Sequence, residues 1–268
     1  MECHYINLDD AVARRSALEA NFAQCRRAGW ELKRFAALDE AAAERSAIPG
    51  RRSWREKGCF LSHRSVIEAQ PDGRSFMVLE DDAHFGSTSM EVIDGLLAEN
   101  SSAQWDLLFT DISPLGLDTM MMLALNRGHL MEKRTVIPLD LSRMSFIGAT
   151  AYVVNGASRR KLLAYLEAGI PVDTEYDVYL NRGMLNGELK AAALFPFVTT
   201  LSEHSTKTQI QSPDTTTTNR ARAVFRRMMW LESTEHSYQA DLATIESRLQ
   251  GTLPAKVAML AGAEYFQD

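Results

Sequence analysis

Short apolar segments alternate with amphipathic helical segments over the first two hundred residues, and this alternation restricts the possible folds more than any other feature. Helical periodicity is clearest between the first two apolar segments, where Leu18, Phe22 and Cys25 share one face. Strand–helix alternation predicts an α/β fold in which a mostly parallel sheet is flanked by helices. The predicted strands are residues 3–8, 30–35, 75–79, 105–110, 149–154 and 191–198.

Composition narrows the class of protein further. Hydrophobic residues make up 46% of the chain and charged residues 24%, which is typical of a globular protein. The net charge of −6 argues against a polyanion binder, so we expect no nucleic-acid partner. Three widely spaced cysteines favour reduced thiols over a disulfide framework or a structural zinc site. The N-terminal apolar run is too short for a signal peptide, which predicts a cytoplasmic protein.

Two regions depart from the alternation. Residues 112–146 are methionine-rich and irregular, and we expect a mobile excursion over a site. From residue 216 two helical patterns follow each other without a strand, which predicts one domain over 1–215 and a helical tail over 216–268. The first tail helix interleaves arginines, including Arg226 and Arg227, with apolar residues. This pattern fits peripheral contact with an anionic membrane, or packing on the domain or on a second subunit.

Glu80, Asp81 and Asp82 directly follow the apolar segment FMVL. Carboxylates at the end of a buried strand repel one another, and a divalent cation relieves that repulsion. Alternate strand residues point to the same side, so Glu80 and Asp82 can converge. Two carboxylates together with phosphate oxygens are a usual set of ligands for Mg²⁺ or Mn²⁺. The alternative is a strand-end turn whose carboxylates are solvated.

Ser62 and His63 lie in a predicted helix over residues 58–69. Neighbouring helical residues point about 100° apart, so the two side chains do not automatically form a catalytic pair. His63 is therefore either a core histidine or a functional residue. Motifs that would favour other nucleotide-binding or hydrolytic folds are absent from the sequence: GxGxxG, GxxxxGK[ST], HExxH and GxSxG.

The order and spacing of several blocks resemble glycosyltransferase family 25, which includes bacterial lipooligosaccharide galactosyltransferases. The resemblance extends from residue 3 to about residue 200. The blocks that carry it are YINLD at 5–9, Arg14-Arg15, GCFLSH at 58–63, LEDD at 79–82, GATAY at 148–152 and PVD at 171–173.

The resemblance implies a GT-A fold, a UDP-hexose donor such as UDP-galactose, Mn²⁺ or Mg²⁺, and inversion at the anomeric carbon. The acceptor would be a saccharide of a surface glycan or lipopolysaccharide, with a lipid-linked acceptor as one form. Asp82 would hold the metal with Glu80, and His204 is a further candidate ligand. The residues implied for the donor are Ile6, Asn7 and Leu8 at the base, Arg14 at the pyrophosphate, Asp81 at the ribose, and Ser62 and His63.

A transferase also needs a base that deprotonates the acceptor hydroxyl. Asp173 follows Pro171-Val172, where a rigid entry can aim its side chain into a cleft, and its alternative role is to cap the following helix. Asp177 lies nearby, and Asp111 ends a predicted buried strand as the acidic triplet does. All three stay candidates.

Two other classes of function remain open at this point. A metal-dependent phosphohydrolase or nucleotidyltransferase also uses acidic residues at strand ends, but forms no glycosylated product. A non-catalytic sugar-binding protein would bind without turnover.

Overall fold

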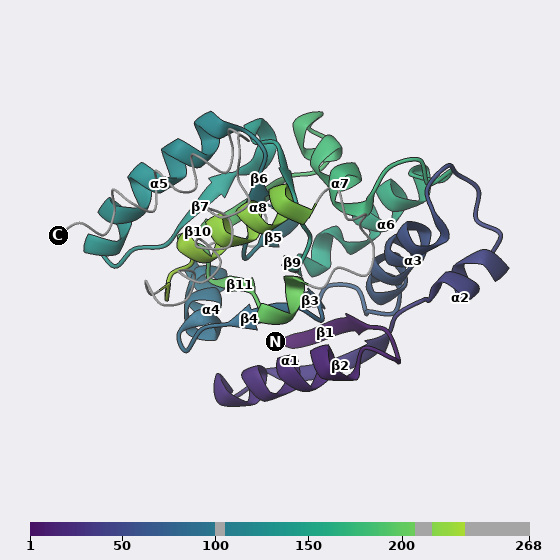
Figure 1. Cartoon of the computed structure of the whole chain (residues 1–268), viewed down its shortest axis with the longest axis horizontal. Helices are drawn as coiled ribbons and strands as arrows, with labels where there is room; N and C mark the ends of the chain where they lie inside the picture. The colour runs from purple at the N-terminus through teal and green to yellow at the C-terminus, as the bar shows by residue number, and fades with distance from the viewer. Residues whose placement is uncertain (100–104, 207–215, 234–268) are drawn as a thin grey trace.

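The computed structural model describes residues 1–99, 105–206 and 216–233, and its centre is a seven-stranded sheet (Figure 1). Because β9 is antiparallel to both β3 and β5, these two strands run in the same direction, as do β1, β2 and β10. The predicted α/β fold with a mostly parallel sheet is thus confirmed. In spatial order the strands are β2 (Glu31–Ala36), β1 (Glu2–Asn7), β3 (Phe76–Glu80), β9 (Ala151–Val154), β5 (Leu107–Phe109), β10 (Ala191–Phe195) and β7 (Ile137–Asp140).

Helices cover both faces of this sheet. The helices α1 (Val12–Gln24) and α4 (Ser89–Glu99) pack on one face, in a core that includes Met77 and Leu79 of β3. Phe76 and Val78 point the other way, into a second core. Burial on both faces explains why β3 is apolar at consecutive positions. Helices of the second core are α3 (Trp54–Glu68), α5 (Leu117–Glu132), α6 (Arg159–Ala168), α7 (Tyr176–Leu185) and α8 (Thr216–Met228).

Short elements follow the strand ends. Two small antiparallel sheets pair β4 (Ala83–Phe85) with β11 (Thr199–Leu201), and β6 (Ser113–Pro114) with β8 (Phe146–Ile147). The remaining short helices are α2 (Glu40–Arg45) and the 3-10 helices η2 (Leu141–Arg143), η3 (Gly156–Ser158) and η4 (Glu203–Thr206).

The helix predicted over residues 58–69 begins earlier, at Trp54. Ser53 accepts a hydrogen bond from the amide of Glu56, and the Glu56 side chain accepts one from the amide of Ser53. This reciprocal capping satisfies amides that the first helical turn would otherwise leave without partners.

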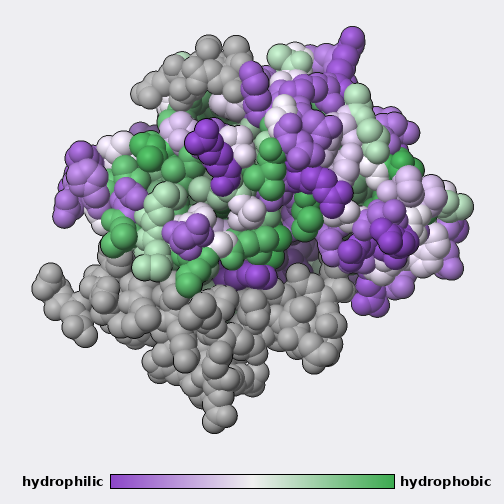
Figure 2. Space-filling view, turned by 90° about the horizontal axis from the view of Figure 1, so that it is seen from above, coloured by the Kyte–Doolittle hydropathy of each residue, from purple (hydrophilic) through white to green (hydrophobic). Residues whose placement is uncertain are grey.

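The expectation of an irregular excursion over residues 112–146 is wrong. The segment contains β6, α5, β7, η2 and β8. Met120 and Leu123 of α5 are buried in the core, whereas Met121, Met122 and Leu125 are exposed. Seen from above, hydrophobic side chains gather on the part of the surface that α5 forms (Figure 2). The methionines thus make a helix with one buried face, which the sequence pattern did not reveal.

The helix α8 packs on the domain. Val224, Phe225 and Met228 belong to the second core, and Arg226 and Arg227 are only 4% and 6% exposed. Arg226 and Arg227 are therefore buried against the domain, and packing of this helix on the domain, one of the two alternatives, is confirmed. Among the described residues, no helix combines the length and apolarity needed to cross a membrane. The second predicted tail helix, 236–250, lies outside the described residues, and the boundary at residue 215 stays a prediction.

Glu232 anchors the segment after α8 to the start of α4. Its carboxylate accepts hydrogen bonds from the amides of Ser87 and Thr88 at 2.8 and 2.7 Å and from both hydroxyls at 3.1 and 2.7 Å. Burial raises the pKa of Glu232, but these hydrogen bonds outweigh burial, and the net pKa lies below the ordinary value. A negative charge here also meets the positive end of the α4 dipole.

We expect Glu232→Ala to lower the free energy of unfolding by about 1–2 kcal/mol, since it leaves helix-terminal amides without their partner. The contribution of Glu232 is complete above the ordinary pKa of 4.5 and is lost as the pH falls through the lower folded-state value. Urea unfolding at neutral and acidic pH measures both effects. The exposed Glu132→Ala on α5 is the control; an equal effect of the two substitutions at neutral pH contradicts the anchor.

Candidate functional site

A cavity of about 890 Å³ opens at the carboxyl edge of the sheet, where the parallel strands β1 and β3 end beside the start of β9. Ligands of open α/β sheets bind at this edge. The cavity brings together most of the residues that the sequence singled out: Ile6, Leu8, Arg14, Ser62, His63, Glu80, Asp81, Asp82 and Asp177 line it. Asn7, Asp111 and Asp173 are not among the lining residues.

The turn after β3 holds two nearly buried carboxylates around one guanidinium. Asp81 and Asp82 are 8% and 9% exposed, and Nη2 of Arg14 lies 2.7 Å from Asp81 Oδ1 and 2.8 Å from Asp82 Oδ2. Asp82 Oδ1 is buried and has no hydrogen-bond partner among the described residues. A buried acceptor without a partner is costly unless a cation or a donor meets it.

The raised pKa values of Asp81 and Asp82 also favour a cation at this turn. Burial raises the pKa of Asp82 to about 7; Arg14 opposes this rise, while Glu80 and Asp81 add to it. Burial likewise raises the pKa of Asp81, despite Arg14 and a hydrogen bond from Asn7. The turn concentrates more negative charge than Arg14 neutralises. A divalent cation at Asp82 would relieve this excess.

Glu80, at the end of β3, is the carboxylate of the triplet that faces the cavity most openly. Its side chain is 34% exposed, and Oε1 lies 3.5 Å from Nε2 of His63, which is an ion-pair distance rather than a hydrogen bond. Burial raises the pKa of Glu80, but His63 and then Arg14 and Arg226 outweigh it and hold the net pKa below the ordinary value. Glu80 is therefore the ionised partner of Asp82 at neutral pH.

The side chains of Asn7 and Ser62 make hydrogen bonds to neighbouring residues of the cavity wall. The Asn7 amide donates to Asp81 Oδ2 at 2.7 Å, and Arg34 Nε donates to Asn7 Oδ1 at 3.0 Å, so Asn7 orients Asp81. The Ser62 hydroxyl donates to the Gly58 carbonyl at 2.6 Å and accepts from the amide of Leu38 at 2.8 Å. It thereby attaches the 37–40 wall to α3.

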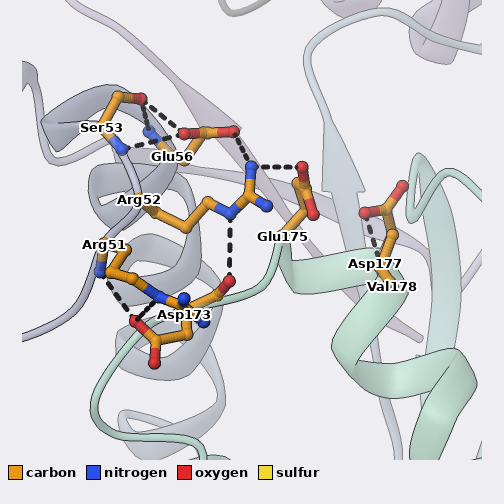
Figure 3. A network of polar contacts seen from close by, with 8 residues as sticks. All are labelled: Arg51, Arg52, Ser53, Glu56, Asp173, Glu175, Asp177 and Val178. Atoms are coloured by element: carbon orange, nitrogen blue, oxygen red, sulfur yellow. Dashed lines mark hydrogen bonds and ion pairs between the residues drawn. The ribbon is translucent and has the colours of Figure 1, made fainter.

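Asp173 lies in a network on the rim (Figure 3). Its Oδ1 accepts from the amide of Arg51 at 2.8 Å and lies 3.4 Å from the Arg51 Nε. In the same network, Arg52 Nη1 lies 3.2 Å from Glu56 Oε1 and 2.6 Å from Glu175 Oε1. The expectations that Asp173 points into the cleft or caps the next helix are both corrected, because Glu175 is the residue at the N-cap of α7.

Asp177, in the first turn of α7, does face the cavity. Its Oδ2 accepts from the amide of Gly148 at 2.6 Å and its Oδ1 from the amide of Val178 at 2.8 Å. Burial raises the pKa of Asp177; the two amides lower it, and Glu80 and Glu175 raise it again, so that the net value is above the ordinary one. Gly148 adopts φ +91°, which favours glycine and allows this amide to reach the carboxylate.

Asp111 is fully buried and serves to position a cation. Its Oδ2 pairs with Nη2 and Nε of Arg226, and the same Nη2 donates to Thr150 Oγ1 at 2.9 Å. Arg226 itself lines the cavity. Arg226, for which the sequence left membrane contact or packing open, thus brings positive charge into the site. Pattern alone could not reveal it, because its partner Asp111 is 115 residues away in the sequence.

His204 lies in η4, next to the lining residue Ser205, and its side chain is outside what the structure describes. Its role as a metal ligand stays a prediction. Tyr176 and Arg222 also line the cavity; no motif marked Tyr176, and Arg222 is one of the arginines of the basic tail helix.

Comparison with known proteins identifies the family of the chain. The sequence model of glycosyltransferase family 25, described as a lipopolysaccharide biosynthesis protein, matches residues 1–178. The chain therefore belongs to glycosyltransferase family 25. None of the curated proteins compared with the chain by sequence matches it.

Two solved structures show a distant likeness. One is the galactosyltransferase LgtC in complex with donor and acceptor sugar analogues, with 12% identity, a TM-score of 0.41, and coverage of 72% of this chain and 73% of that one. The other is an active-site mutant of LgtC, with 14% identity, a TM-score of 0.35 and 72% coverage of each chain.

Proposed function

We propose that the protein is a metal-dependent, inverting glycosyltransferase that moves a hexose, galactose in the first instance, from a UDP-sugar to a saccharide acceptor of a surface glycan or lipopolysaccharide. The observation that carries the proposal is the buried, partnerless Oδ1 of Asp82, which faces a large cavity in a chain of family 25. A carboxylate oxygen in this position fits a cation that binds together with a nucleotide diphosphate.

Asp82 and Glu80 would hold Mn²⁺ or Mg²⁺. Both metals prefer carboxylate oxygens, and Arg14 already lies between Asp81 and Asp82 as a cation of the chain. When bound, the metal acts as a Lewis acid that stabilises the departing diphosphate. Arg14 and Arg226 line the same cavity and would bind diphosphate oxygens by charge-assisted hydrogen bonds.

The donor would lie along the end of β1. Ile6 and Leu8 offer apolar contact to the uracil ring, and Asp81 can accept a hydrogen bond from a ribose hydroxyl. Asn7 supports this role indirectly, because it fixes the Asp81 carboxylate through Oδ2. The wall over residues 37–40, attached to α3 by Ser62, would close the other side of the nucleotide.

Asp177 is the carboxylate best placed to act as the base. It would accept the proton of the acceptor hydroxyl as that oxygen attacks the anomeric carbon and the bond to UDP breaks. A raised pKa makes a carboxylate a stronger base at neutral pH, provided that it is still ionised. Attack on the face opposite the leaving group inverts the anomeric carbon. The two backbone amides fix the direction of the carboxylate, which favours a positioned base.

The test is a panel of nucleotide sugars, with and without saccharide acceptors, soluble or lipid-linked. We expect UDP release that requires Mn²⁺ or Mg²⁺ and a glycosylated product seen by mass spectrometry, with UDP-galactose as the best donor. Nucleotide release with no glycosylated product for any acceptor would favour a phosphohydrolase. Failure of every UDP-sugar to bind or react would overturn the proposal.

A further inference from the structure

Three side chains of different chemistry meet on one wall of the cavity. Cys59 and His63 are one helical turn apart on α3 and share a face, and Glu80 reaches them from the end of β3. One ligand atom from each, the thiol sulfur, an imidazole nitrogen and a carboxylate oxygen, lies within 4.8 Å of the other two. All three residues line the cavity, and the Glu80 side chain is 34% exposed.

One His63 nitrogen makes a hydrogen bond, and the other lies 3.5 Å from Glu80 Oε1 without one. The ring is 1% exposed, and Nδ1 lies 2.9 Å from the Tyr152 hydroxyl, which lies 2.8 Å from the Tyr176 hydroxyl. The His63 ring also stacks on Tyr176, with centroids 4.1 Å apart and planes at 10°. Nε2 is buried and has no hydrogen-bond partner among the described residues. The histidine is thus held rigidly with one polar atom directed at the cluster.

The hydrogen bonds from His63 to the Tyr152 hydroxyl and on to the Tyr176 hydroxyl allow His63 to be a metal ligand. If Nδ1–H donates to Tyr152, and the Tyr152 hydroxyl donates to Tyr176, every hydrogen bond in the chain is satisfied. The Nε2 atom then carries a lone pair, and Glu80 Oε1 lies 3.5 Å from it. Histidines that bind metals are commonly oriented by a hydrogen bond at the other ring nitrogen.

We propose that Cys59, His63 and Glu80 form a second metal site, which takes zinc and leaves a fourth position open to the cavity. Zinc binds thiolate, imidazole and carboxylate together, whereas Mg²⁺ and Mn²⁺ prefer oxygen ligands. Tetrahedral zinc bonds of about 2.0–2.3 Å place ligand atoms roughly 3.3–3.8 Å apart. The His63–Glu80 separation of 3.5 Å already meets this range, and the Cys59 sulfur lies within 4.8 Å of a ligand atom of each.

The raised pKa of the Cys59 thiol argues against a role as a nucleophile. Burial, together with the nearby charges of Glu80, Asp177 and Glu56, raises the pKa of its thiol well above the ordinary value. Reactive cysteines have lowered pKa values.

Zinc at this site would compete with the transfer reaction. This consequence rests on the proposed function, in which Glu80 helps Asp82 to hold the Mn²⁺ or Mg²⁺. A zinc ion that takes Glu80 withdraws this carboxylate from the other metal, so zinc would act as a reversible inhibitor. Binding itself does not depend on the proposed function and can be measured without any substrate.

The test uses Co²⁺ as a coloured probe for zinc in the full-length protein. We expect one Co²⁺ per chain with a thiolate-to-cobalt charge-transfer band, intense visible bands of tetrahedral geometry, and displacement of both by Zn²⁺. Cys59→Ser should lose the charge-transfer band, whereas Cys25→Ser, a matched change at another thiol, should keep it. Asp82→Asn should also keep it, which separates this site from the Mn²⁺ or Mg²⁺ site.

A second measurement needs no variant. Zn²⁺ should slow the alkylation of Cys59 in the unmodified protein by at least about tenfold, and leave Cys25 unchanged, as read by peptide mass spectrometry. No charge-transfer band in the unmodified protein, or a band that survives in Cys59→Ser, overturns the proposal. Cobalt binding in a protein that transfers no sugar would leave the zinc site standing and reject only the transferase function.

Discussion

Asp82→Asn is expected to reduce turnover by about 10³-fold or more, which corresponds to several kcal/mol of transition-state stabilisation. The neutral amide keeps the size of the side chain but removes the charge that would hold the metal. Steady-state transfer rates measured across a Mn²⁺ titration provide the test. The variant should also lose the dependence of donor binding on Mn²⁺.

Two controls make this prediction specific. Asp81→Asn should have a milder effect, because Asp81 is assigned to the ribose and keeps its hydrogen bond from Asn7. Asp72→Asn changes a carboxylate in the turn before β3, at the opposite end of that strand, and should leave turnover unchanged. Full activity of Asp82→Asn in the presence of a chelator would refute the metal assignment.

Asp177→Asn is expected to lower kcat by roughly 10²–10⁴-fold while donor affinity is retained, since the change removes the proton acceptor and keeps the shape. The amide oxygen can still accept a hydrogen bond from Gly148, so the fold of the α7 turn should persist. Single-turnover rates report the chemical step, and calorimetry with UDP or a UDP-sugar reports donor binding.

The other two carboxylates serve as comparisons. Asp173→Asn affects an exposed contact with Arg51 and should leave kcat within a few-fold of the unmodified protein. Asp111→Asn removes the charge that pairs with buried Arg226, so it should lower stability as well as activity. An inactive Asp173→Asn together with an active Asp177→Asn would move the role of base to Asp173.

The strands and the acidic turn could be predicted from the sequence because local patterns determine them. β3 is apolar at four consecutive positions since both of its faces are covered, and the charge begins where the strand leaves the core. The resemblance implied Arg14 at the pyrophosphate and Asp82 at the metal, and the structure brings these two side chains to 2.8 Å from each other.

Other features depend on contacts that no local pattern encodes. The buried ion pair of Asp111 with Arg226 joins β5 to α8, and an arginine in an amphipathic helix resembles a surface residue until its partner is known. Asp173 and Asp177 are four residues apart, and only the position of the α7 start decides which of them faces the cavity. The Cys59–His63–Glu80 cluster likewise takes its third member from another element.

The location of Arg226 has a consequence for how the protein is made. The ribosome adds Asp111 long before Arg226. The growing chain therefore contains a carboxylate that the fold buries, but not yet the guanidinium that neutralises it. We expect a chain that ends after residue 206 to be more sensitive to proteases near β5 than the complete chain, because Asp111 then lacks its cation. Equal resistance of the two chains would contradict this expectation. In the intact protein, the helix that brings a cation to the cavity is also the last described helix to be synthesised, so the site would mature late.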